Sequence, residues 1–430
     1  RTIDGLAAAV RRALAQARPA TMSRPSASTG AIFLTGATGV VGAHLAKHLL
    51  ATTRRDLVCL ARGRDGADAR ERCRRLLRAY DEEGALADEF DRRVTVISGD
   101  VSQPSLGLDA AAHRELASGI DLVIHAAART SLHGVHDDLA PVNVDGTRRV
   151  VELALATPGR RLIQVSSYAV IGDRLFQPVT FTEHDVDIGQ GFEGLGYART
   201  KLEAERVVRA AGADGLRWVI VRPGNVFGDS ATGRYPLEGI GVPGLYYDLL
   251  RAIIALGAAP DTRQPFDVTP VDYVSRGIAH VGLERSDSHA TYHLVNPERT
   301  SLRDVVLELR ELGYDVALVP PEEFVRRARE RAGEIRSTSL ELLLFNPALL
   351  AGGDGAVLSS EHTRQLLGAA GVECPRVRDL LPTYVAYCAA RAYLPPPRRV
   401  LVAGGEAPPG TPVQPSTAAH APTHPTPEAR

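Results

Sequence analysis

The sequence has few residues of several kinds, and each shortage argues against a class of protein. Only four of its 430 residues are cysteines, and none of them falls in a CxxC pair or beside a cluster of histidines. This spacing argues against a zinc site and against a disulfide framework. Lysine plus arginine number 50 and aspartate plus glutamate number 51, for a formal net charge of -1. No excess of positive charge therefore points to nucleic acid or to an anionic membrane surface as a partner.

Long apolar runs are also missing. No stretch approaches the roughly 20 apolar residues of a membrane span, and the N-terminus lacks the charged-then-apolar order of a signal peptide. The chain is nevertheless 44% hydrophobic and 23% charged, and at roughly 150 residues per domain it has room for two or three folded units. These features exclude disorder as its main state. They predict a soluble cytoplasmic protein that binds neither membrane nor nucleic acid.

Seven short apolar runs alternate with helical patterns over residues 31–295. Short runs that are apolar throughout are typical of parallel strands that are buried on both faces and joined by crossover helices. The predicted strands are 31–35, 57–61, 94–98, 121–125, 162–166, 217–222 and 291–295. The sequence therefore predicts an α/β fold, with a Rossmann doubly wound parallel sheet of about seven strands.

The remaining segments predict a smaller, helix-rich subdomain. The alternation stops after Val226, and the pattern beyond Ser301 is largely helical, for example over 322–331 and 380–393. The predicted division is a Rossmann domain at 31–225 with 266–295 returning to it, a substrate or lid subdomain at 226–265 and 296–394, and a disordered tail at 395–430. The tail is rich in proline, alanine, glycine and threonine and has too little apolar surface to offset the entropy of ordering.

The loop after the first predicted strand carries the pattern GxxGxxG, at Gly36, Gly39 and Gly42. Between a strand and a helix, the first glycine permits a tight turn, the second lets the backbone approach a pyrophosphate, and the third lets the helix pack closely on the sheet. The loop therefore predicts a dinucleotide site. Its candidate cofactor contacts are Thr35, Gly36, Thr38, Gly39, Val40, Val41 and Gly42.

The end of the second strand favours NADPH over NADH. Sites that prefer NADH usually place an acid there to hold the ribose 2'-hydroxyl, but Asp56 precedes the strand and Arg62 follows it. A guanidinium in this place can pair with a 2'-phosphate. The alternative is that Arg62 and Arg64 are solvated loop charges.

Two further strand ends supply candidate contacts to the dinucleotide. Asp100 and Val101 follow the third strand, where the carboxylate can accept a hydrogen bond from the adenine amino group. His125 ends the fourth strand, and we expect it to be a packed structural group rather than a base. The small residues that follow, Ala126, Ala127 and Ala128, let the dinucleotide lie flat across the strand ends.

A tyrosine and a lysine four residues apart, Tyr197 and Lys201, are the candidate catalytic pair. This spacing places both on one helix face. A lysine ammonium near a phenol favours the phenolate, so we expect Lys201 to lower the pKa of Tyr197 and to contact the nicotinamide ribose. At the end of the fifth strand stands Ser167, whose hydroxyl can hydrogen-bond the substrate oxygen beside Tyr197.

Serine, tyrosine and lysine in this order behind a glycine-rich loop resemble the short-chain dehydrogenase/reductase family. NVDGT at 143–147 and RPGNVFG at 222–228 look like motifs of its extended branch. The resemblance implies that Pro223 lies near the nicotinamide carboxamide. The further cofactor contacts that we expect are Asn143, Ser166, Tyr197, Lys201, Asn225 and Val226.

Longer strings narrow the resemblance to the terminal thioester reductase domains of nonribosomal peptide synthetases and polyketide synthases, which are related to the reductase domains of carboxylic acid reductases. The strings are TGATGVVGAHLAKHLL, GDVSQPSLGLD, GYARTKLEAE, RPGNVFGDSATG and TPVDYV. The resemblance implies that Arg62 and Arg72 bind the 2'-phosphate of NADPH. Two departures stand out: the family's usual Ser-Lys-Trp reads Thr-Lys-Leu here, and Arg234 with Tyr235 stands where an asparagine is expected. The second departure leaves the substrate contacts unassigned.

The first 30 residues indicate what precedes the reductase. Apolar residues recur at helical spacing over 1–18, and this short amphipathic helix resembles the last helix of a carrier domain. Residues 19–30 are rich in proline and serine, as in a linker. We therefore expect a phosphopantetheine-bearing carrier domain upstream in the same chain and a monomeric reductase domain. An ordinary capping helix, or a free-standing reductase that starts at Met22, stays open.

Together the motifs predict the NADPH-dependent reductive release of a carrier-bound acyl or peptidyl thioester as an aldehyde, with or without further reduction to the alcohol. Ser167 and Tyr197 would stabilise the developing oxyanion. The glycine-rich stretch 189–196 would be either a mobile gate next to Tyr197 or a plain surface connector. One alternative function is an extended-family reductase or epimerase that acts on a small carbonyl compound or a nucleotide sugar. The other is a non-catalytic NADPH-binding regulator. No metal is expected.

Overall fold

The structure, a computed structural model, describes residues 30–131, 134–237, 244–284, 288–331, 333–345 and 355–397. All of them belong to the unit Ser23–Arg399. The predicted helix over 1–18, nearly all of the predicted linker at 19–30 and most of the predicted disordered tail at 395–430 lie outside the described residues. These three therefore stay predictions.

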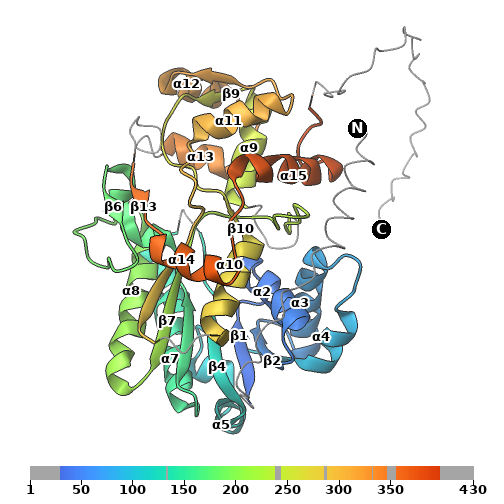
Figure 1. Cartoon of the computed structure of the whole chain (residues 1–430), viewed down its shortest axis with the longest axis vertical. Helices are drawn as coiled ribbons and strands as arrows, with labels where there is room; N and C mark the ends of the chain where they lie inside the picture. Colours follow the sequence, from blue (N-terminus) through green and yellow to red (C-terminus); the bar gives the residue numbers. More distant parts are fainter. Residues whose placement is uncertain are drawn as a thin grey trace, which may run out of the picture. The chain divides into compact units, whose positions relative to one another are not determined.

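A seven-stranded parallel sheet with helices around it fills the lower half of the view in Figure 1. Its strands are β1 (Ala31–Thr35), β2 (Leu57–Ala61), β3 (Val94–Ser98), β4 (Ile120–His125), β5 (Arg161–Val165), β7 (Arg217–Pro223) and β11 (Ala290–Leu294). Their spatial order is β11-β7-β5-β4-β1-β2-β3, and every neighbouring pair is parallel. The strand order reverses beside β1, which places a ligand at the carboxyl ends of β1 and β4. The predicted fold class is confirmed, and each predicted strand lies within one residue of the observed one.

The side chains of β1 show why helices cover both faces of the sheet. Ile32 and Leu34 belong to one buried apolar cluster, whereas Phe33 belongs to another. Because successive side chains of a strand point to opposite faces, the two clusters lie on opposite sides of the sheet. Helices α2 (Val40–Thr52), α3 (Gly66–Tyr80), α4 (Ala87–Arg93), α10 (Val271–Ala279) and α14 (Glu361–Ala369) contribute to the first cluster. Helices α5 (Ala110–Gly119), α7 (Asp145–Ala156) and α8 (Gly196–Ala210) contribute to the second, and α6 (His136–Asn143) packs against α8.

A third apolar cluster lies outside the sheet, in the segments predicted to form a lid, which we call the lid below. It joins α9 (Leu245–Leu256), α11 (Leu302–Glu311), α12 (Pro321–Arg331), α13 (Thr338–Phe345), α15 (Val377–Ala390) and the paired strands β9 (Ala258–Pro260) and β12 (Ala317–Val319). Aromatic rings form part of it: the ring centroid of Phe227 lies 5.1 Å from that of Tyr247 and 5.6 Å from that of Tyr384. Helices α12 and α15 correspond to the helices expected over 322–331 and 380–393.

Short strand pairs fasten the lid segments to the sheet domain. Strand β8 (Val226–Phe227) pairs with β10 (Thr269–Pro270), and β6 (Thr180–Phe181) pairs with β13 (Val357–Leu358). Helix α14 places Leu367 in a core cluster of the sheet. This part of 296–394 therefore packs with the nucleotide-binding domain, while the predicted domain boundaries as a whole stay a prediction.

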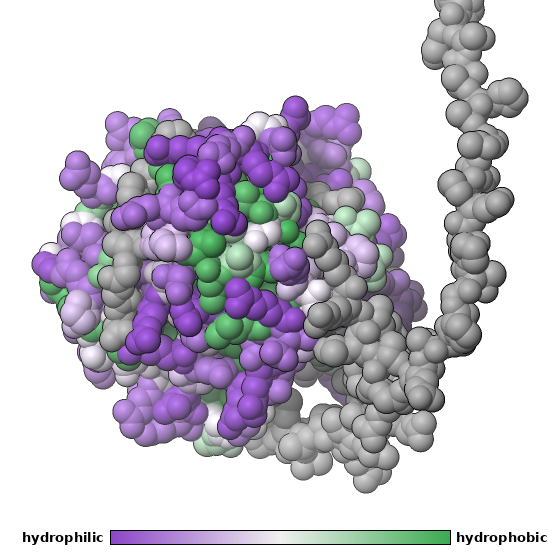
Figure 2. Space-filling model, turned by 90° about the horizontal axis from the view of Figure 1, so that it is seen from above, coloured by the Kyte–Doolittle hydropathy of each residue, from purple (hydrophilic) through white to green (hydrophobic). Residues whose placement is uncertain are grey.

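The surface seen from above, from the side of α12 in Figure 1, is mostly polar. Figure 2 shows hydrophilic side chains around a patch of hydrophobic ones near the middle of this face. Within the described ranges, no helix combines the length and the apolar character that a membrane span requires.

Candidate functional site

The glycine loop between β1 and α2 has the geometry of a pyrophosphate site. Gly36 has a φ of +79°, and a Cβ here would lie 2.6 Å from the backbone of Ala126, so this position requires glycine. A Cβ on Gly42 would collide with the carbonyl oxygen of Gly36. A Cβ on Gly39 would meet that oxygen alone, at 3.4 Å, so the space beside Gly39 is open.

The start of α2 is also open to an anion. Among the described residues, no side chain caps this helix at Gly39, and the first N–H groups of a helix have no partner within it. Thr38, Val40 and Val41 are half-buried in the same turn. The residues of this loop therefore fit the pyrophosphate of a dinucleotide, in line with the prediction.

At the end of β4, Thr35 and His125 form a buried pair. The hydroxyl oxygen of Thr35 accepts from the N–H of Ala127 at 3.2 Å and is hydrogen-bonded to Nδ1 of His125 at 2.6 Å. Burial and the nearby Lys201 lower the pKa of His125 to about 3, so the ring is neutral. His125 is a packed structural group, as expected. Residues 126–128 lie beside it and are half-buried.

The arginines at the end of β2 form one exposed group. A guanidinium nitrogen of Arg72 donates to the carbonyl oxygen of Arg62 at 2.8 Å, which ties helix α3 to the end of the strand. Arg62 is exposed, and Arg64 pairs with Asp68 at 3.7 Å on the neighbouring turn. In the loop after β3, Oδ1 of Asp100 accepts from the backbone N–H and the hydroxyl of Ser102, both at 2.8 Å. Val101 is buried next to it.

Ser167, Tyr197 and Lys201 come together at the carboxyl end of β5. Ser167 follows the strand, and Tyr197 and Lys201 lie on the first two turns of α8. The ammonium of Lys201 donates to the carbonyl oxygen of Val165 at 2.7 Å. Tyr197 is hydrogen-bonded to Ser167. The predicted constellation is therefore assembled, and its catalytic role stays a prediction.

We expected Lys201 to lower the pKa of Tyr197, and this expectation is wrong for this structure. Burial raises the pKa of Tyr197 to about 12, and only the hydrogen bond with Ser167 acts in the opposite direction. The ammonium of Lys201 is directed to the carbonyl of Val165 instead. Burial also lowers the pKa of Lys201 to about 8, although the carboxylate of Glu205 opposes this shift.

Two expected cofactor residues make buried contacts within the protein. The amide group of Asn143 donates to the carbonyl of Arg129 at 3.1 Å and to the hydroxyl of Thr200 at 3.0 Å, and its oxygen accepts from the N–H of Arg129 at 2.8 Å. Asn143 thus links the loop after β4 to α8. The hydroxyl of Ser166 donates to Glu205 at 2.6 Å and is turned into the protein core. Cofactor contacts of both residues stay predictions.

The RPGNVFG motif leads from β7 to the lid. Pro223 ends β7 beside Leu294 of β11, and half-buried Val226 begins β8. The side-chain oxygen of Asn225 accepts from the hydroxyl of Tyr168 at 2.7 Å. Its backbone N–H donates to Asp267 at 2.6 Å. Through Tyr168, which follows Ser167, the motif therefore lies next to the predicted catalytic residues.

Three residues that lie near the predicted site were not identified from the sequence: Tyr168, Tyr246 and Asp267. The hydroxyls of Tyr168 and Tyr246 are hydrogen-bonded to each other, and the ring of Tyr246 packs 5.3 Å from that of Phe266 in the lid. Burial raises the pKa of Asp267 to about 6. The signal for Tyr168 was its place directly after Ser167, but Tyr246 and Asp267 arrive only through folding of the lid.

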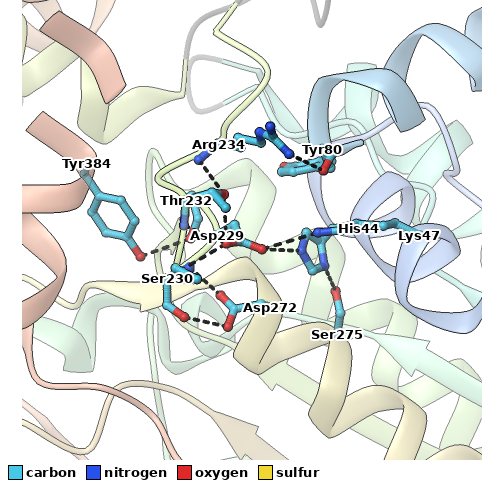
Figure 3. Close-up of polar contacts among 12 residues, drawn as sticks. His44, Lys47, Tyr80, Asp229, Ser230, Thr232, Arg234, Asp272, Ser275 and Tyr384 are labelled. Atoms are coloured by element: carbon cyan, nitrogen blue, oxygen red, sulfur yellow. Dashed lines mark hydrogen bonds and ion pairs between the residues drawn. The ribbon is translucent and has the colours of Figure 1, made fainter. Parts of the chain in front are cut away.

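A buried polar junction joins α2 to the loop after β8 and to α10 (Figure 3). Nε2 of His44 lies 3.1 Å from Oδ2 of Asp229, and its Nδ1 lies 3.0 Å from the hydroxyl of Ser275. Asp229 also pairs with Lys47 at 3.5 Å and accepts from the hydroxyl of Thr232 at 2.9 Å. Burial alone would raise the pKa of Asp229, but His44 and Lys47 outweigh it and hold that pKa well below its usual range.

The departure at Arg234 and Tyr235 extends this junction. The guanidinium of Arg234 donates to the carbonyl of Tyr80 at 3.3 Å (Figure 3). It also donates to Glu82 at 3.3 Å. The carbonyl of Tyr235 accepts from the hydroxyl of Tyr387 at 2.9 Å. These two residues therefore hold the loop between α3 and α15.

The glycine-rich stretch 189–196 is fastened at its first half. The side chain of Gln190 donates to the carbonyls of Val170 and Val186, at 3.1 and 2.8 Å, and the N–H of Gly191 donates to Asp173 at 2.7 Å. The two alternatives for this stretch, a mobile gate and a surface connector, both stay open.

A family model of NAD-binding proteins, described as Male sterility protein, matches residues 34–278, more than half of the chain. The chain belongs to this family. The match confirms that the predicted domain binds a nicotinamide dinucleotide, while the choice of NADPH over NADH stays a prediction.

Curated relatives that match the sequence are much longer proteins. A linear gramicidin synthase of Brevibacillus parabrevis is 30% identical over 355 residues, which cover 81% of this chain and 7% of that protein. The L-2-aminoadipate reductase large subunit of Eremothecium gossypii is 31% identical over 330 residues, which cover 72% of this chain and 23% of that protein. The chain thus spans less than a quarter of each of these two relatives.

A solved structure matches nearly end to end. The terminal R domain from the myxalamid PKS-NRPS biosynthetic pathway has a TM-score of 0.76 and 30% identity, and the match covers 87% of this chain and 94% of that domain. The predicted resemblance to terminal reductase domains of assembly-line synthases is therefore confirmed. The relatives also confirm the oxidoreductase class at the level of the family.

Proposed function

We propose that this chain is an NADPH-dependent thioester reductase, which releases a carrier-bound acyl or peptidyl chain as an aldehyde. The observation that carries the proposal is the convergence of Ser167, Tyr197 and Lys201 beside an open glycine loop. The kinship with a terminal R domain and with the large chain of an aminoadipate reductase supports it.

The residues that would hold NADPH line the carboxyl edge of the sheet. Gly39 and the start of α2 would bind the pyrophosphate. Arg62 and Arg72 would pair with the 2'-phosphate, because both guanidinium groups lie at the exposed end of β2. The remaining contacts would come from Asp100, Val101, residues 126–128, Lys201 and Pro223. When bound, the cofactor supplies a hydride to the carbonyl carbon of the thioester.

Tyr197 would act as the acid at the substrate oxygen. Because its pKa is raised to about 12, its hydroxyl keeps its proton at neutral pH and can donate to the oxygen as negative charge develops. Ser167 would offer a second hydroxyl to the same oxygen. Addition of the hydride and the proton to the thioester gives a thiohemiacetal. The thiohemiacetal then loses the thiol, because its C–S bond breaks as the C=O bond re-forms. In sum, thioester, NADPH and a proton become aldehyde, thiol and NADP⁺.

The partner we propose is a carrier domain in the same chain, upstream of this one. The chain matches only a small part of its much longer relatives, as expected of one domain in a longer protein. A tethered thioester reaches an effective concentration in the millimolar range through a short linker, so no tight interface is required. The reductase unit itself is proposed to be monomeric.

The test compares NADPH consumption by the full chain with three substrates. An acyl-pantetheine thioester should be reduced, whereas the matching free acid and a nucleotide sugar should not. A faster reaction with the nucleotide sugar would instead favour the extended-family reductase or epimerase. Loss of NADPH with no thioester-dependent aldehyde would count against the proposal.

A further inference from the structure

A carboxylate that the proposed mechanism does not use lies fully buried one turn beyond Lys201. Glu205 has 0% of its surface exposed and accepts three hydrogen bonds. Its Oε1 accepts from the hydroxyl of Ser166 at 2.6 Å and from Nε of Arg222 at 2.9 Å, and its Oε2 accepts from Nη2 of Arg222 at 2.8 Å. Arg222 is likewise fully buried.

This ion pair joins the three segments that carry the proposed site. Ser166 precedes Ser167 at the end of β5, Arg222 precedes Pro223 on β7, and Glu205 shares α8 with Lys201. A buried ion pair is weak as a source of stability, because desolvation of both charges offsets their attraction. Its location points to positioning of the site.

The surroundings of Lys201 contain few charges. The carbonyl of Val165 takes its hydrogen bond, His125 faces it from β4 as a neutral ring, and Glu205 is the carboxylate that favours its charged form. Around Glu205 stand Arg222 from β7, Arg209 at 3.7 Å on α8, and His293 from β11, which touches Arg222 at 3.2 Å.

We propose that Glu205 is a positioning residue for the reductase reaction: it fixes the serine turn through Ser166 and keeps Lys201 protonated through its negative charge. This inference rests on the proposed function, because it assigns Lys201 a role in cofactor binding and catalysis. Position 205 follows Lys201 by four residues, which places both side chains on one face of α8.

The experiment measures, in the full chain, the pH dependence of kcat/KM for an acyl-pantetheine thioester and of the dissociation constant for NADPH. In Glu205→Gln we expect the alkaline limb of both profiles to move to lower pH by about one unit, since an opposite charge nearby typically shifts a pKa by roughly 1–3 units. Glu203→Gln is the matched control, because Glu203 lies on the same helix but pairs with His136 and Arg199 near the surface. Its profiles should match the wild type.

Glu205→Asp separates charge from shape. If charge matters, the shorter but charged variant should keep the alkaline limb closer to that of the wild type than the isosteric glutamine does. If glutamine leaves the limb in place, or if Glu203→Gln moves it as far, the inference is overturned. Should Glu205→Gln fail to fold with Arg222 unpaired, the double variant Glu205→Gln with Arg222→Met removes both charges. It must still move the limb to lower pH, though by less than the single variant, because loss of the positive charge of Arg222 acts in the opposite direction. Because NADPH binding is measured without turnover, a wild type that binds NADPH but reduces no thioester would count against the proposed function alone.

Discussion

The ammonium of Lys201 donates a 2.7 Å hydrogen bond to the carbonyl oxygen of Val165, the last residue of β5. This contact holds the lysine against the end of the strand that Ser167 follows, while burial lowers its pKa from the usual 10.5 to about 8. The charge of Lys201 is therefore present below about pH 8 and is lost as the pH rises through that value.

This pKa gives the first prediction. If the reaction needs the ammonium, kcat/KM should be flat near neutral pH and fall about tenfold per unit above pH 8. Lys201→Arg keeps a charge at every accessible pH, so its residual activity should lack this alkaline limb. A wild-type limb that persists unchanged in Lys201→Arg would show that another group titrates.

The second prediction tests Tyr197 as the proposed acid, through removal of its hydroxyl. Tyr197→Phe deletes the hydroxyl that is hydrogen-bonded to Ser167, and we expect kcat to fall by about 10²–10⁴-fold, the usual contribution of a general acid. The dissociation constant for NADPH should stay within about twofold, since the proposed role of the phenol is toward substrate. Near-normal thioester reduction would contradict the assignment.

The cofactor preference can be tested at the end of β2. Replacement of both Arg62 and Arg72 by alanine should weaken NADPH by about 100-fold or more, since hydrogen bonds to charged groups are worth roughly 1.5–3 kcal/mol each, and should change NADH little. Arg75→Ala is the control, because it lies on the same helix and is exposed. Equal losses for both cofactors would contradict the assignment of Arg62 and Arg72 to the 2'-phosphate.

The junction in Figure 3 predicts a pH-dependent loss of stability. Asp229→Asn should lower the free energy of unfolding by about 2–4 kcal/mol at pH 7, because a buried carboxylate paired with His44 and Lys47 is lost. The pKa of Asp229 is depressed in the folded state, so this advantage of the wild type is full above about pH 4 and shrinks as the pH falls further. Denaturant titrations at several pH values measure it, with the exposed Asp137→Asn as control.

The sheet was predictable because most of its strands are buried on both faces. Runs such as 57–61 are apolar throughout, so the first and last residues of the strand can be read from the sequence. The predicted start and end of α15 each differ from the observed ones by three residues. At the start, Pro382 is accommodated inside the helix, and at the end Ala392, with a φ of +54°, turns the chain just beyond it.

The positions of site residues were predictable where they follow from spacing within one helix or loop. Tyr197 and Lys201 are one turn apart, so their common face follows from the helix. The direction in which the pKa of Tyr197 shifts did not follow from this spacing, because the hydrogen-bond partner of Lys201 is a backbone carbonyl on another element. The burial of Glu205 likewise depends on Arg222, which only the packing of β7 beside α8 brings near.

The most direct measurement follows the hydride. The full chain would be given an acyl-pantetheine thioester and NADPH that carries deuterium at the transferred position of the nicotinamide, and the products would be analysed by mass spectrometry. The account predicts an aldehyde with one deuterium on its carbonyl carbon, and one equivalent of free pantetheine thiol for each NADPH consumed until aldehyde reduction, if any, begins. Release of unlabelled carboxylic acid with NADPH unspent, or label found only in a nucleotide sugar and never in the acyl product, would contradict it.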